Sequence, residues 1–229
     1  MSDPGDIDLN LPYGSPSQFG TLTGWNSGDA TITETKQVAT TEDEYDDVTA
    51  AKEYDTKTEV TQPFKAAALT APDLPEYCGD ILGGKLVTKI SIKTKATDFV
   101  EMELTGHNHA VNAHAANSDH RLLEHGITLD SGFGAKNFLG ATLGDECTIE
   151  SADLDIEINH DDILNGLTGN HFAGNNYHGH LTCTMVFRGV PTSFCDASWT
   201  VIPSKATGKK KNTYASITVK AEKWIALDV

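Results

Sequence analysis

The sequence from Glu150 to His160 reads Glu-Ser-Ala-Asp-Leu-Asp-Ile-Glu-Ile-Asn-His, and it decides the fold class. Apolar and acidic residues alternate along it with a period of two, which predicts a β-strand with one buried face and one wet face. The buried face is expected to hold Ala152, Leu154, Ile156 and Ile158. The opposite face holds Asp153, Asp155 and Glu157, because an unpaired carboxylate is too costly to bury in a core.

Similar extended segments recur along the chain and predict an all-β protein. We expect seven to nine strands, at 31–38, 48–54, 57–65, 86–92, 100–104, 150–160, 180–188, 197–203 and 213–221. A tight turn is expected at 96–98, between two half-buried strands that run antiparallel. No regular alternation of strands and helices appears, which excludes the common α/β folds. The pattern favours a mainly antiparallel sandwich or barrel with one or two short helices.

The chain divides into an extended N-terminal arm, 1–30, and a single β-rich domain, 31–229. The arm is rich in Gly, Pro, Ser and Asp but carries large apolar residues, Phe19 and Trp25 among them, so we expect it to dock either on its own domain or on a neighbouring subunit, and we predict the neighbouring subunit. A short helix is expected at 117–125, ended by Gly126.

The composition is acidic, with a net charge of -16. Residues 1–80 hold sixteen acidic residues and four lysines. Such a balance disfavours nucleic-acid and anionic-membrane partners, and the lysines at 205 and 209–211 are expected to lie on a solvated hairpin tip. No apolar run predicts a membrane span and no signal peptide is expected. The four cysteines, Cys78, Cys147, Cys183 and Cys195, fit no zinc spacing and are expected to be free thiols.

All nine histidines lie between residues 107 and 180. His107 and His109, like His178 and His180, form His-x-His pairs that project to one side of a strand and are able to share a metal, with His114 and His120 as further ligands. The alternative is a set of polar histidines near turns. Because nothing in the sequence fixes the remaining ligands, we expect no bound metal.

No other pattern predicts chemistry. His120 and His125 are five residues apart, so a helix would not present both to one zinc ion. Nucleophile elbows and phosphate-binding loops are absent from the sequence. The acidic stretches 42–47 and 157–162 are expected to be solvated loops, with weak calcium binding as the alternative. The glycine-rich stretch 169–178 is expected to be a loop, which a carbohydrate-binding module would use. We therefore expect no enzyme, no catalytic residue and no cofactor.

The chain resembles the tail tube-forming proteins of long-tailed phages in its strand-rich layout over 30–222, the Thr/Asp-rich hairpin region 31–65, the short helix expected near 117–125 and the closing strands 180–188 and 213–221. This resemblance implies a self-assembling virion subunit that forms stacked rings or a tube, joined to other virion structural proteins and assembled in the host cytoplasm. DNA would pass without specific binding, with Asp153, Asp155 and Glu157 as possible channel-facing acids. The alternatives are a capsid decoration, head-completion or fibre protein, and a carbohydrate-binding β-sandwich module.

Overall fold

The computed structural model describes residues 15–45, 48–110, 123–124, 126–134, 147–189, 198–202, 206–207 and 216–226. These residues form strands and connecting segments without a helix. The strands are β1 (Trp25–Ser27), β2 (Thr31–Glu42), β3 (Val48–Ala66), β4 (Tyr77–Cys78), β5 (Ile81–Leu82), β6 (Lys85–Lys95), β7 (Glu101–His109), β8 (Leu123–Glu124), β9 (Thr148–Leu164), β10 (His171–Arg188), β11 (Thr200–Ile202), β12 (Ala206–Thr207) and β13 (Ser216–Ala226). The expectation of an all-β, mainly antiparallel fold is confirmed.

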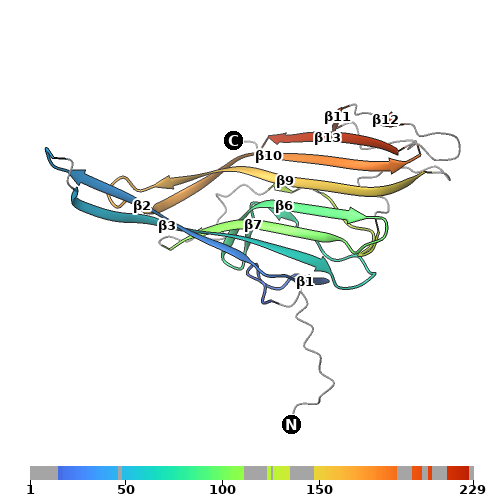
Figure 1. The fold of residues 1–229 in the computed structure, drawn as a ribbon, viewed down its shortest axis with the longest axis horizontal. Helices are drawn as coiled ribbons and strands as arrows, with labels where there is room; N and C mark the ends of the chain where they lie inside the picture. The colour runs from blue at the N-terminus through green and yellow to red at the C-terminus, as the bar shows by residue number, and fades with distance from the viewer. Residues whose placement is uncertain are drawn as a thin grey trace, which may run out of the picture.

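One sheet dominates the described part of the chain (Figure 1). Its strand order is β1-β3-β7-β6-β9-β10-β13-β11, with β2 on β3, β5 on β6 and β12 on β13, and the named pairs are antiparallel. A second pair, β4 and β8, is separate. The expected turn between β6 and β7 is present at 96–97.

One face of this sheet carries the core. Ile90 of β6 pairs with Leu104 of β7 on one side and with Ile156 of β9 on the other, and all three are fully buried. The predicted register of 150–160 is confirmed, because Ala152, Leu154, Ile156 and Ile158 are all buried. Connecting segments supply further buried residues to the same cluster, so the fold is sandwich-like.

The described part of the expected arm, 15–30, belongs to the domain's own core. Phe19 is almost fully buried and Trp25 is buried beside it in the core cluster. The Trp25 indole donates a hydrogen bond to the backbone carbonyl of Asp73 at 2.6 Å. These contacts are made within one chain, so the described part of the arm packs on its own domain.

Several local expectations are wrong. The segments 48–54 and 57–65 are one strand, β3, and the acidic stretch 157–162 lies inside β9 and is not a loop. Most of the expected loop 169–178 belongs to β10. The helix expected at 117–125 is not confirmed, since Leu123–Glu124 form strand β8 and the rest lies outside the described residues, as do the lysines at 205 and 209–211.

Two long hairpins, β2–β3 and β9–β10, extend toward the same end of the molecule (Figure 1). The end of the β9–β10 hairpin contacts β3: the Lys52 ammonium donates to the carbonyl of Thr168 at 3.3 Å, and the backbone N–H of Asp55 donates to the Asn170 side chain at 3.4 Å. No helix in the described ranges is long and apolar enough to cross a membrane.

Candidate functional site

The site lies where β6 begins and its two neighbours continue without it. Leu86 and His107 are the last pair between β6 and β7, and Lys89 and Glu157 are the last pair between β6 and β9. Strand β7 continues to His109, and β9 continues to Leu164. Beyond the end of β6, polar side chains of β7 and β9 contact each other directly.

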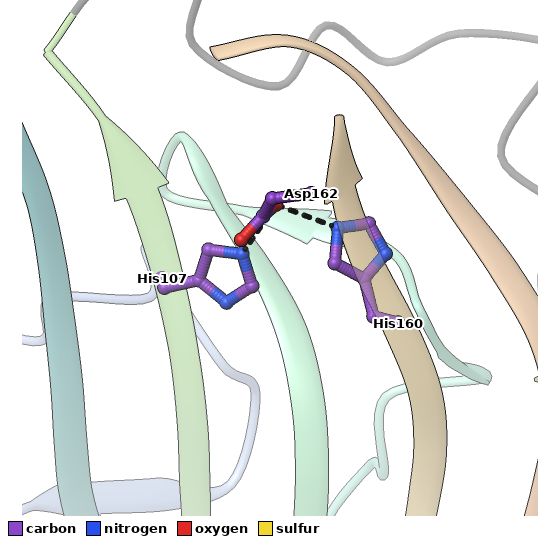
Figure 2. A group of neighbouring side chains, drawn as sticks. All are labelled: His107, His160 and Asp162. Carbon is purple, nitrogen blue, oxygen red and sulfur yellow. Dashed lines mark hydrogen bonds and ion pairs between the residues drawn. The ribbon is translucent and has the colours of Figure 1, made fainter. Parts of the chain in front are cut away.

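The centre of the site is the carboxylate of Asp162 on β9. Its Oδ1 atom lies 3.3 Å from Nε2 of His107 and 3.0 Å from Nε2 of His160, as Figure 2 shows. The same oxygen lies 3.2 Å from Nε2 of His109 and 3.7 Å from Nε2 of His171. Four imidazoles from β7, β9 and β10 therefore surround one carboxylate oxygen. We call these five residues the His–Asp cluster.

The geometry of β9 explains why a core strand ends in this cluster. His160 and Asp162 have the same parity as Ile156 and Ile158, so they continue the inward face of the strand. Their side chains are 3% and 16% exposed, which shows that the strand turns polar without turning outward.

Strand β3 contributes two charged residues. Thr35 of β2 pairs with Lys57 of β3, and Gln37 pairs with Tyr54. Strand β3 therefore has one more residue than β2 between these two pairs, which is a β-bulge. Asp55 lies there with a φ of 46°, a left-handed conformation that Asp tolerates better than most residues. The bulge brings the Asp55 Oδ1 atom 2.7 Å from Nδ1 of His109. Nearby, the Lys57 ammonium lies 2.8 Å from Oδ2 of Asp162.

Burial and charge act in opposite directions on the pKa values here. Burial would raise the pKa of the Asp162 carboxyl, but hydrogen bonds from His107, His109, His160 and Lys57 hold it far below its ordinary value. Burial lowers the pKa of His107 despite Asp162. At His109 burial also disfavours the charged form, yet Asp162 and Asp55 together raise the pKa above its ordinary value. Asp162 is therefore the fixed negative charge of the cluster.

Two sets of three ligand atoms in this cluster lie within 4.8 Å of one another. One set is His107, His160 and Asp162, and the other is His109, Asp162 and His171. Imidazole and carboxylate are the donors that bind zinc and related ions.

The structure places the two His-x-His pairs in different surroundings. His107 and His109 both enter the cluster, as a shared site requires, and they are joined by His160, Asp162 and His171, which the sequence did not point to. His178 and His180 instead pack on Trp224, with the His180 ring stacked on the indole at a centroid distance of 3.8 Å. His114, His120 and His125 lie outside the described residues.

The face of β9 that carries Asp153, Asp155 and Glu157 is partly exposed, and lysines of β6 lie next to these acids. Asp153 and Glu157 are exposed and Asp155 is half-buried. The Lys89 ammonium of β6 lies 2.5 Å from Glu157 and 3.5 Å from Asp155. Lys93 of β6 pairs with Asp153 across the sheet. Lysines on the next strand therefore reduce the repulsion that the sequence alone indicates.

Comparisons with known proteins leave the function to be argued from these features. No protein-family model matches the chain, and no curated protein matches it significantly.

Proposed function

We propose that this protein is a structural subunit that assembles with copies of itself through the β2–β3 hairpin. The observation that carries the proposal is the exposure of β2. All twelve residues of this strand are exposed, although the strand pairs with β3 along its length with two register shifts. A long exposed edge strand is a template for pairing with another chain, and natural monomers usually shorten or block such edges.

Exposed apolar side chains support an interface on the two hairpins. On β2–β3 they are Ile32, Val38, Tyr45 and Val48. On β9–β10 they are Ile163, Leu164, Leu167 and Phe172, and Leu167 at the tip is 92% exposed. Concentration of apolar side chains on two neighbouring protrusions is typical of an interaction surface.

The two edges of the sheet favour a second copy of this chain as the partner that binds the hairpin. The sheet has one edge at β2 and another at β11 and β12, on opposite sides of the strand order. Pairing of unlike edges is a heterologous contact, which closes into rings or continues into filaments. This repeat geometry supports the narrower proposal of a phage tail tube subunit, joined to other virion proteins. Asp153, Asp155 and Glu157 would then face a channel that repels DNA phosphates.

The test is a pair of lysine substitutions on the exposed edge, Ile32→Lys with Val38→Lys. Each adds a charge to an apolar position, and every 1.4 kcal/mol lost from an interface is about a tenfold weaker association. We expect the double variant to associate at least about 100-fold more weakly than the unmodified chain, measured by sedimentation velocity.

Leu69→Lys is the matched control, because Leu69 is also exposed but lies outside the strands. Circular dichroism must show that all proteins fold alike. Equal association of the double variant and the unmodified chain would remove the hairpin from the interface.

A further inference from the structure

Four imidazole rings of the His–Asp cluster converge on one carboxylate oxygen. Nε2 atoms of His107, His109, His160 and His171 all lie 3.0–3.7 Å from the Oδ1 atom of Asp162. The other carboxylate oxygen of Asp162 lies 2.8 Å from the Lys57 ammonium. The four rings therefore turn the same atom toward one point, as the ligands of a single metal ion do.

His109 is held in this arrangement from its other side. Its Nδ1 atom lies 2.7 Å from Oδ1 of Asp55. Its Nε2 atom lies 3.2 Å from Oδ1 of Asp162 and belongs to one of the two sets of converging ligand atoms.

We propose that the His–Asp cluster binds one divalent transition-metal ion of the zinc type. Asp162 is the ligand common to both sets of converging donors, and the imidazole Nε2 atoms supply the rest. Imidazole-rich sites with one carboxylate suit zinc and its neighbours, whereas calcium and magnesium prefer all-oxygen sites. Four of the five side chains are enough for the tetrahedral coordination that zinc prefers.

The surroundings of the cluster match those of metal sites. A metal-binding histidine usually donates its second ring N–H to a carboxylate, which fixes the ring's orientation, and Asp55 holds His109 in this way. The His109 and His171 rings are stacked at 4.1 Å and are both almost fully buried. Zinc–nitrogen and zinc–oxygen bonds are about 2.0–2.2 Å long, so two ligand atoms of a tetrahedral zinc ion lie about 3.3 Å apart, close to the 3.0–3.7 Å that separates Oδ1 of Asp162 from the four Nε2 atoms.

The site would join β7 to β9 beyond the end of β6, where the sheet leaves these two strands apart. Its ligands come from β7, β9 and β10, beyond the end of β6, and Asp55 belongs to the hairpin strand β3. The ion would fix the root of β2–β3 against β9–β10. This inference does not depend on self-assembly, because a monomer would bind the ion equally well.

The first experiment uses the full chain stripped with a chelator and then titrated with zinc chloride. We expect saturable binding of one zinc per chain by calorimetry and by elemental analysis after dialysis. Titration with cobalt(II) should give the visible absorption of a tetrahedral or five-coordinate site. This spectrum reports coordination in the unmodified protein, so it holds even if ligand variants fail to fold.

The variants separate ligands from other histidines. Asp162→Asn with His160→Gln should abolish stoichiometric binding and the cobalt spectrum. Asp55→Asn should keep one zinc per chain but weaken the affinity about 10- to 100-fold, because it removes only the support of His109. His180→Gln is the matched control, since His180 is a β10 histidine stacked on Trp224, and it should bind as the unmodified chain does.

Two results would overturn the proposal. One is the absence of saturable zinc and cobalt binding at micromolar concentrations by the folded chain. The other is binding that the Asp162 and His160 substitutions leave unchanged while the protein stays folded, which would place the ion elsewhere on the chain.

Discussion

A comparison of two single variants, Ile156→Ala and Asp155→Ala, tests which face of β9 is buried. Ile156 is fully buried and pairs with Ile90 on one side and Leu181 on the other. Removing most of a buried Ile side chain costs about 2–5 kcal/mol, because apolar burial is lost and a cavity remains. Asp155 points to the other face, where its side chain is 42% exposed, its carboxylate lies 3.5 Å from the Lys89 ammonium and the Ser91 hydroxyl donates a hydrogen bond to it. A half-exposed ion pair contributes about 0–1 kcal/mol and such a hydrogen bond about 0.5–1.5 kcal/mol.

The assay is equilibrium unfolding in urea, followed by circular dichroism, of both variants and the unmodified chain. We expect Ile156→Ala to lower the free energy of unfolding by about 2–5 kcal/mol and Asp155→Ala by no more than about 2 kcal/mol. The dependence of that free energy on urea should not change, which indicates an unchanged folded state. Equal losses at the two positions, or a larger loss at Asp155, would refute the register and with it the face that leads to His160 and Asp162.

Two further predictions concern a thiol and the acidic strand face. Burial raises the pKa of the Cys78 thiol to about 12, so on the order of one thiol in ten thousand is ionised at pH 8, and iodoacetamide should label Cys78 far more slowly in the folded chain than in urea. Labelling at equal rates, read by peptide mass spectrometry, would contradict its burial. Replacing Asp153, Asp155 and Glu157 together by lysine should leave folding intact but make assembled protein retain DNA in a salt-dependent way, measured by co-sedimentation. If the lysine variant retains no more DNA than the unmodified assembly, these acids do not line a channel.

The sequence predicts the fold class and the core because both depend on local alternation. In 150–160 the apolar residues are spaced by two and acids fill the gaps, so only one register buries Ile156 without burying a carboxylate. Burial of Phe19 and Trp25 shows why the arm carries large apolar residues, but composition alone does not say whose core they enter.

The cluster is only half predictable. His107 and His109 are recognisable as a pair, but their partners lie more than 50 residues away, on β9 and β10. The stretch 157–162 resembles a loop because it is polar, although parity places Asp162 on the inward face. Its burial depends on tertiary contacts, since Lys57 and four imidazoles compensate the charge.

The bulge at Asp55 is the other feature that sequence patterns miss. The extended segments 48–54 and 57–65 each predict a strand, and only Asp55 and Thr56 lie between them. The structure keeps one strand and places one residue in a left-handed conformation, which sends Asp55 toward His109. Strand propensity describes the flanking residues, whereas the bulge is set by pairing with β2 and β7.

Electron microscopy of the concentrated full chain tests the central claim of self-assembly most directly. Negatively stained particles should be rings or tubes of one diameter, and their number should rise with protein concentration. A field of single globular particles at every concentration, with a monomer mass by light scattering, would contradict the claim.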